Sequence, residues 1–149
     1  MALFGAPLAH EDHAMRACYA AVWMQDAIGR YAEELRRRQG LDVQIRIGLN
    51  SGEVVVRSIG SDLHMDYTAV GQTTHLAGRM EQLARPGTTP MTANTLRLAE
   101  GFVEVTSLGP VPVKGLMDPV ESYELMRVRP QRSRLRAAAA HGLTRFVGA

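Results

Sequence analysis

Apolar residues between positions 10 and 39 recur at spacings of three, four, six and seven, which places them on one face of a helix. The residues of this face are Ala14, Cys18, Ala21 or Val22, Ile28, Tyr31 and Leu35. Acidic residues at positions 11–12 and arginines at 36–38 complement the helix dipole at its two ends, and Gly40 is a typical terminator. The pattern predicts a long amphipathic helix over residues 10–39.

Alternating apolar and polar residues over positions 43–49 predict a strand. Asn50-Ser51-Gly52 then predicts a turn, and the apolar run that follows it predicts a returning strand over residues 53–59. We therefore expect these two strands to pair as a hairpin. After a polar stretch, a further short strand is expected over residues 67–70.

The second half of the chain mixes helices and strands. Gly71 separates the short strand from a helix over 73–84, and Thr92 is the expected cap of a shorter helix over 93–100. Strands are expected over 102–108 and 120–126, on either side of a glycine- and proline-rich turn at 109–115, and residues 1–4 resemble the end of a strand. This order indicates an α+β, ferredoxin-like fold rather than regular βαβ repetition.

Charge is distributed unevenly along the 149 residues. Residues 127–149 hold six arginines and no acid, so residues 1–126 keep 11 of the 17 basic residues against all 15 acidic ones, a net charge of −4. Lys114 is the single lysine. A mildly acidic body argues against a nucleic-acid-binding domain, and arginines without interleaved aromatic residues are typical of a linker.

Other classes of protein are excluded by simple features. No apolar run approaches the roughly 20 residues of a membrane span, and residues 1–7 lack the charged and apolar segments of a signal peptide. Cys18 is the single cysteine, which excludes an internal disulfide and a zinc site made of several cysteines. We expect a cytoplasmic protein with neither a membrane nor a nucleic-acid partner.

The strand-to-helix junction at Gly71 carries the clearest chemistry. Backbone N–H groups and polar side chains gather there at the positive end of a helix, where proteins commonly hold anions. His75 and Arg79 are four residues apart and so share one helix face. In the purely structural alternative, Thr73 caps the helix, His75 is half-exposed and Arg79 pairs with an acidic residue.

Four ordered blocks of the sequence resemble the class III adenylate/guanylate cyclase catalytic domain. They are residues 45–56 (IRIGLNSGEVVV), 66–73 (DYTAVGQT), 76–81 (LAGRME), and 113–115 (VKG) leading into 120–125 (VESYEL). The blocks keep the order and spacing of that family, and the resemblance covers residues 1–126. It implies a partial nucleotide cyclase homology domain over 1–126, followed by a basic linker over 127–149.

The resemblance also implies a reaction and an assembly. Two catalytic domains pair head to tail, as a homodimer or with a partner cyclase domain, and ATP or GTP binds in the cleft between them. The nucleoside triphosphate becomes a 3′,5′-cyclic nucleotide and pyrophosphate, for intracellular signalling. Two aspartates hold two Mg²⁺ or Mn²⁺ ions, and metals and cations together offset charge on the reacting phosphorus.

Four residues of this chain match functional positions of the family. Arg79 falls on the transition-state arginine, Lys114 on the triphosphate lysine and Thr68 on a base-contacting position. An arginine guanidinium can donate hydrogen bonds to two phosphate oxygens at once, and a lysine ammonium is a mobile point charge that suits a triphosphate. Lys114 is also compatible with a solvent-exposed turn that has no functional role. His75 stands where the family usually has asparagine. Two alternatives are therefore open: His75 keeps a hydrogen bond to the ribose or phosphate, or the role of this position is lost.

The two metal-binding aspartates of the family have no counterpart in this chain. They belong to a first strand and a hairpin that would precede residue 2, together with a purine-reading lysine, and Asp12, Asp62 and Asp66 do not replace them. The expected fold therefore lacks its first strand and part of the following hairpin. We expect poor metal binding and no cyclisation by this chain, since losing such ions costs roughly 10³-fold or more in rate.

Two hypotheses remain open, and a third, a nucleic-acid binder that uses the arginine tail, is disfavoured. In the first, the chain is the catalytic domain of a cyclase that is truncated at its N-terminus. In the second, it is a non-catalytic cyclase-like module for dimerisation or for regulating a partner cyclase. The sheet edge that a missing strand exposes predicts a tight homodimer. The tail resembles the junction between such domains and a large downstream ATPase region.

Overall fold

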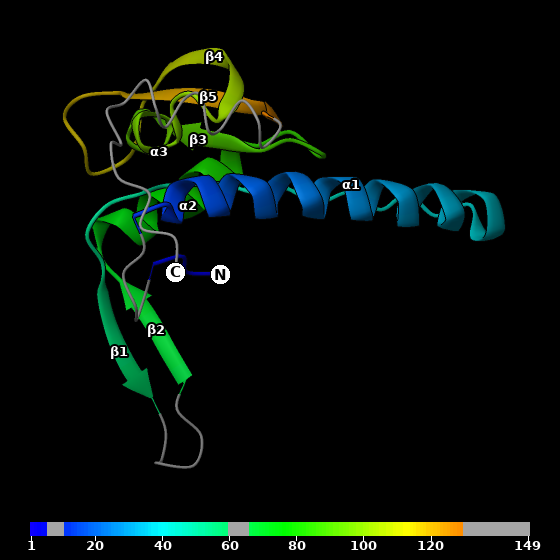
Figure 1. Cartoon of the computed structure of the whole chain (residues 1–149), viewed down its shortest axis with the longest axis horizontal. Helices are drawn as coiled ribbons and strands as arrows, with labels where there is room; N and C mark the ends of the chain where they lie inside the picture. Colours follow the sequence, from blue (N-terminus) through cyan, green and yellow to red (C-terminus); the bar gives the residue numbers. More distant parts are fainter. Residues whose placement is uncertain (6–10, 60–65, 130–149) are drawn as a thin grey trace, which may run out of the picture.

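The computed structural model describes residues 1–5, 11–59 and 66–129, with the backbone alone for 56–59 and 66–70. The elements are α1 (His13–Gln39), β1 (Val55–Ile59), β2 (Asp66–Val70), α2 (Gln72–Leu83), β3 (Pro90–Thr92), α3 (Ala93–Ala99), β4 (Val103–Val111) and β5 (Val120–Val128). Figure 1 shows α1 projecting past the rest of the molecule, and the β1–β2 pair extending away from it as a separate arm. The predicted α+β class is confirmed.

A three-stranded antiparallel sheet has the order β3-β5-β4. Because β5 is central, Tyr123 pairs with Met91 of β3 on one side and with Ser107 of β4 on the other. The register between β4 and β5 shifts after Glu104 and again after Ser107. These two irregularities let β4, which is nine residues long, stay paired with β5. Both strands continue beyond the predicted ends, so β4 includes the first part of the expected turn at 109–115.

The predicted hairpin of 43–49 with 53–59 is wrong. β1 pairs instead with β2 in an antiparallel two-stranded sheet, whereas Leu49 forms a parallel bridge to Met91 of β3. The backbone N–H groups of Ile47 and Leu49 donate to the carbonyls of Thr88 (3.3 Å) and Pro90 (3.0 Å). Residues 45–49 thus run along the outer side of β3, and Asn50-Ser51-Gly52 carries the chain away from it rather than back.

Gly48 explains why this extended segment fits where it does. A Cβ atom at Gly48 would lie 2.1 Å from the Glu81 backbone nitrogen and 2.5 Å from the Ala77 carbonyl oxygen. The backbone of α2 therefore lies directly against residue 48, and only glycine allows that approach. A long ion pair between Arg46 and Glu81 (3.7 Å) joins the same two elements at the surface.

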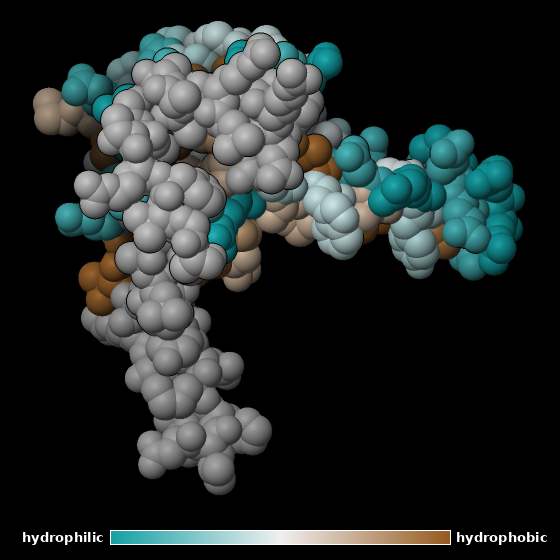
Figure 2. Space-filling view, viewed as in Figure 1, coloured by the Kyte–Doolittle hydropathy of each residue, from teal (hydrophilic) through white to brown (hydrophobic). Residues whose placement is uncertain are grey.

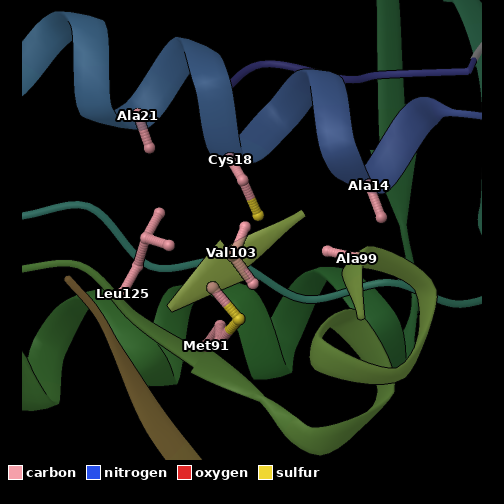
Figure 3. Close-up of a cluster of buried hydrophobic side chains, with 7 residues drawn as sticks. All are labelled: Ala14, Cys18, Ala21, Met91, Ala99, Val103 and Leu125. Carbon is pink, nitrogen blue, oxygen red and sulfur yellow. The ribbon is translucent and has the colours of Figure 1, made fainter. Parts of the chain in front are cut away.

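The buried core lies between α1, α3 and one face of the sheet. Its buried residues are Ala14, Cys18, Ala21, Met91, Ala99, Val103 and Leu125, with Ile47 and Leu49 packed at its margin. Figure 3 shows the Cys18 side chain pointing from α1 toward Val103 and Met91. Small residues on α1 let the helix approach the sheet closely, so the predicted amphipathic face is confirmed over its first three turns.

The second half of α1 is far less covered than the first. Tyr31, in that second half, is 56% exposed, and Figure 2 shows a hydrophilic tip at the far end of this helix. The helix ends as predicted at Gly40, whose backbone is left-handed (φ 67°) and whose N–H donates to the Arg36 carbonyl at 3.1 Å.

Three smaller expectations have different outcomes. Residues 1–4, read as the end of a strand, form no strand here. Thr92 is the N-cap residue of α3 as predicted, but its side chain makes no capping hydrogen bond to that helix. Most of the predicted linker, residues 130–149, lies outside the described residues.

Replacing Gly48 with alanine is expected to destabilise the fold. The new methyl group meets backbone rather than a flexible side chain, so α2 or the extended segment must shift, at a cost of about 3 kcal/mol. Urea unfolding measures the change. Gly29→Ala is the matched control, since nothing lies within 4 Å of that position in α1, and it is expected to stabilise by about 1 kcal/mol. Equal stability of Gly48→Ala and the parent would contradict the role of this contact.

Burial raises the pKa of the Cys18 thiol to about 12. The thiol is therefore neutral in the folded protein at mildly alkaline pH, and we expect it to resist thiol-specific reagents until urea unfolds the chain. Because the ordinary pKa is 9.0, the unfolded chain releases this proton first, and the contribution of Cys18 to stability declines as the pH rises from about 9 toward 12. Rapid labelling of the folded chain would contradict this.

Candidate functional site

The β2–Gly71–α2 junction holds three of the four predicted site residues. Thr68 lies in the middle of β2, where its Cα pairs with Arg57 of β1. Gly71 is the N-cap residue of α2, with φ 121°, a conformation that favours glycine. His75 and Arg79 then follow one turn apart on α2. The chain thus places Thr68 on the strand before α2, His75 in the first turn of that helix and Arg79 one turn further along.

His75 and Arg79 differ in their surroundings. His75 is exposed, rather than half-exposed as the structural alternative had it. Arg79 is half-buried and its Nη1 donates to the Gln82 amide oxygen at 3.2 Å, so it pairs with a neutral group and not with the acid that was expected. Its Nε is buried and has no hydrogen-bond partner among the described residues. An arginine held without a carboxylate keeps its charge available for an anion.

Lys114 lies apart from that junction along the chain. It belongs to the connection between β4 and β5, where residues 114 and 115 form a turn, and its side chain is exposed. Neighbouring Val113 is buried and its carbonyl accepts a hydrogen bond from the Leu116 N–H at 3.1 Å, so the turn is fixed at its base. No described residue forms an ion pair with Lys114, and no hydrogen bond connects it to Arg79 or His75 in the described part of the chain.

A polar network that the sequence did not predict holds the start of α2. The Asn50 side-chain N–H donates to the Thr73 carbonyl at 2.9 Å, and its amide oxygen accepts from the Thr92 hydroxyl at 2.6 Å. The Thr73 hydroxyl donates to the Glu53 carbonyl at 2.6 Å instead of capping α2, so that expectation is wrong. Asn50 therefore ties the first turn of α2 to the end of β3.

A second pair of hydroxyls completes this network. Ser51 and Thr95 are both buried, and their Oγ atoms are 3.0 Å apart. Thr95 is 1% exposed at the start of α3, so this bond has little competition from water. The sequence signals were an asparagine and a serine after an apolar strand and a Thr-x-x-Thr spacing at positions 92 and 95. Such residues are common at turns and caps, so the pattern by itself predicts only local contacts.

The described residues do not fit a divalent metal ion. No three histidine, cysteine, aspartate or glutamate side chains come together among those that the structure describes, in residues 1–5, 11–55 and 71–129. Magnesium and manganese prefer several oxygen ligands, with carboxylates supplying the charge. In the described part of the chain, Arg79 and Lys114 are therefore present without a cluster of acidic side chains that could hold a metal ion.

Comparison with known proteins identifies the family of this chain. A sequence model of the adenylate and guanylate cyclase catalytic domain matches residues 1–127. The chain belongs to this family. Among its relatives, adenylate cyclase 1 of Rhizobium meliloti is 29% identical over 130 residues, and soluble guanylate cyclase 89Da of Drosophila melanogaster is 33% identical over 127 residues. Each match covers 85% of this chain but only 19% and 18% of the relative.

Solved structures agree with the sequence comparison. The guanylyl cyclase Cya2 superposes with a TM-score of 0.78 at 33% identity, over 86% of this chain and 65% of that one. The adenylyl cyclase CyaB of P. aeruginosa superposes with a TM-score of 0.75 at 26% identity, over 85% of this chain and 66% of that one. The predicted cyclase fold is thus confirmed, and the chain spans about two thirds of these solved domains.

Replacing Asn50 with alanine is expected to loosen the first turn of α2. The substitution leaves the Thr73 carbonyl and the Thr92 hydroxyl without their partner, at a cost of about 1–3 kcal/mol. Hydrogen exchange at the start of α2 should accelerate and the urea midpoint should fall. Gln72→Ala is the control, because Gln72 is exposed on the same turn and has no part in the network. Unchanged exchange in Asn50→Ala would contradict this role.

Proposed function

We propose that this chain is the phosphate-binding part of a nucleotide cyclase site, in which a nucleoside triphosphate becomes a 3′,5′-cyclic nucleotide and pyrophosphate. Arg79 stabilises charge on the reacting phosphate and Lys114 binds the triphosphate. Thr68 contacts the purine edge, and His75 supplies one hydrogen bond to the ribose or phosphate. Family membership supports the reaction. The observation that carries the assignment of the site is Arg79, which is half-buried and has no acidic partner among the described residues.

The proposed substrate is a purine nucleoside triphosphate, either ATP or GTP. Relatives of this chain include proteins named as adenylate cyclases and as guanylate cyclases. A threonine at position 68 suits either purine, because its hydroxyl both donates and accepts a hydrogen bond. In this proposal the chain acts in the cytoplasm. Among the described residues, no helix combines the length and the apolar character needed to cross a bilayer.

In the same proposal the chain alone does not cyclise nucleotides. Arg79 and Lys114 occupy the family's cationic positions, but the family's two aspartates have no counterpart in the sequence. The described acidic residues form no ligand cluster. Mg²⁺ or Mn²⁺ would have to be held by carboxylates from another domain. The partner is accordingly a second cyclase domain, paired head to tail so that its aspartates face the Arg79 side of this one.

A non-catalytic module is the second candidate function. The observation that favours it is the same lack of a described acidic cluster, together with His75 in place of the usual asparagine. Such a module pairs with a complete cyclase domain and regulates it without contributing to chemistry. The two candidates differ in one measurable respect, which is whether Arg79 accelerates the reaction in the mixed pair.

The organisation of the domain is part of the proposal. Residues 1–126 form a partial cyclase homology domain, and coverage of about two thirds of the solved cyclase domains supports this. Residues 127–149 form a basic linker toward a further region of the protein, proposed to be an ATPase. An in-frame upstream sequence that encodes a strand with aspartate and a Gly-Asp-Gly hairpin would assign the whole to a complete enzyme.

Purified chain is expected to form no cyclic nucleotide above background with Mn²⁺ and either ATP or GTP. The physical reason is that the charge on the triphosphate is not offset by metal ions, which lowers the rate roughly 10³-fold or more. Product formation is followed by chromatography of the cyclic nucleotide. Turnover above the level of a heat-denatured control would overturn the proposed inactivity.

Complementation tests the role of Arg79. A cyclase domain that keeps its metal-binding aspartates, with its transition-state arginine replaced by alanine, is expected to regain activity when mixed with this chain. Arg79→Ala in this chain should reduce that activity by about 10²–10³-fold, the effect of losing one transition-state donor. Arg97→Ala, at an exposed position of α3, is the control and should leave the activity intact. No regain of activity in any mixture would favour the non-catalytic module.

A further inference from the structure

Arg79 and Gln82 lie three residues apart in the second half of α2. Residues at that spacing are neighbours on one face of a helix, and helical side chains lean toward the N-terminus of their helix. Gln82 therefore leans toward Arg79, and its amide oxygen accepts a hydrogen bond from Arg79 Nη1 at 3.2 Å. Because Gln82 is exposed, water competes for this bond, and the contact can open without disturbing the core.

The other end of the same guanidinium is in a different environment. Arg79 Nε is buried, and no described residue accepts a hydrogen bond from it. A buried donor of a charged group without an acceptor is unfavourable, and native structures contain few of them. Because the atom is covered, a ligand cannot reach it while the side chain keeps this conformation. The described state of Arg79 is therefore one in which its hydrogen-bonding capacity is only partly used.

Phosphate binding needs more of that capacity. Arginine binds a phosphate most strongly when it donates two parallel hydrogen bonds from one edge of the guanidinium. The edge formed by Nη1 and Nη2 includes the atom that Gln82 already engages, and the edge formed by Nε and Nη2 includes the atom that the protein covers. In the described conformation neither edge is entirely free for a phosphate.

We propose that Gln82 is a positioning residue that restrains Arg79, and that Arg79 breaks the bond to Gln82 when it binds a phosphate group through two donors. Once released, the Arg79 side chain leans toward His75, which lies one turn closer to the N-terminus of α2. Gln82 thereby lowers the phosphate affinity of the site without touching the substrate. This inference rests on the proposed function, in which Arg79 binds the reacting phosphate.

A neutral acceptor suits this role better than an acidic one. A carboxylate at position 82 would offset the charge of Arg79 and compete directly with a phosphate. The single acidic residue of α2, Glu81, is two positions from Arg79, so the two side chains do not face each other. Glu81 pairs instead with Arg46 at 3.7 Å. The amide of Gln82 thus restrains the guanidinium but leaves its charge in place.

The expected size of the effect follows from the strength of one neutral hydrogen bond. A ligand that binds only the released conformation has an apparent affinity reduced by the fraction of molecules that are restrained. Removing the acceptor should therefore tighten phosphate binding by roughly two- to ten-fold. Replacing it with a carboxylate should weaken binding by roughly two- to five-fold, because an exposed ion pair restrains the arginine more strongly.

Titration of the whole chain with inorganic tripolyphosphate, followed by NMR of the α2 backbone amides, measures these changes. Gln82→Met keeps the length of the side chain but removes the acceptor, and Gln82→Glu introduces the carboxylate. The matched controls are Gln72→Met, at an exposed position of the same helix, and Gln39→Glu, at the exposed far end of α1 (Figure 1). Both controls should bind tripolyphosphate as the parent chain does. Circular dichroism establishes that each variant folds.

The Arg79 Nε–H signal in the same spectra reports the restraint without any ligand, and its exchange with solvent should be faster in Gln82→Met than in the parent chain. Tighter binding by Gln82→Met that disappears when Arg79→Ala is added supports the proposal, because the effect then acts through Arg79. Unchanged or weaker binding by Gln82→Met, together with weakened binding by Arg79→Ala, overturns this inference and leaves the proposed function standing. Equal binding by the parent chain and Arg79→Ala overturns the proposed function of Arg79 and this inference with it.

Discussion

The close packing of α2 against Gly48 is the contact on which the rest of the structure depends. Because no side chain intervenes, the helix holds residues 45–49 against β3 from one face, while Ile47 and Leu49 pack toward α1 on the other. The parallel hydrogen bonds to residues 88–92 then follow from this position. One glycine therefore connects both layers of helices to the sheet, and a methyl group there would separate them.

The same contact positions the candidate site. The chain leaves the extended segment at Asn50, whose side chain links the first turn of α2 to Thr92, and the hydroxyls of Ser51 and Thr95 close the network. His75 and Arg79 lie on the helix that this network holds. Arg79 bonds to a neutral amide. Among the described residues no carboxylate pairs with Arg79, so its guanidinium keeps its charge for an anion.

One helix, α2, carries two candidate site residues and also contacts the extended segment at 45–49. His75 lies in its first turn and Arg79 one turn further on, and its backbone at residues 77–81 meets Gly48. In the proposed function, a domain whose described residues include these cations but no cluster of carboxylates takes its metal ligands from a partner domain.

By itself the sequence determined the local features. The spacing of apolar residues predicted α1, Gly71 marked the start of α2, and the motifs around Arg79 and Lys114 indicated the cyclase family, because periodicity, chain breaks and motifs are encoded by neighbouring residues. Only the tertiary structure decided which strands pair and what surrounds each side chain. It paired 45–49 with β3 instead of with 53–59, and it joined Asn50 to Thr92 across 42 positions. A strand has two edges at which another strand can pair. Packing against residues distant in the sequence selects the strand that pairs at each edge, and no local sequence pattern encodes that choice.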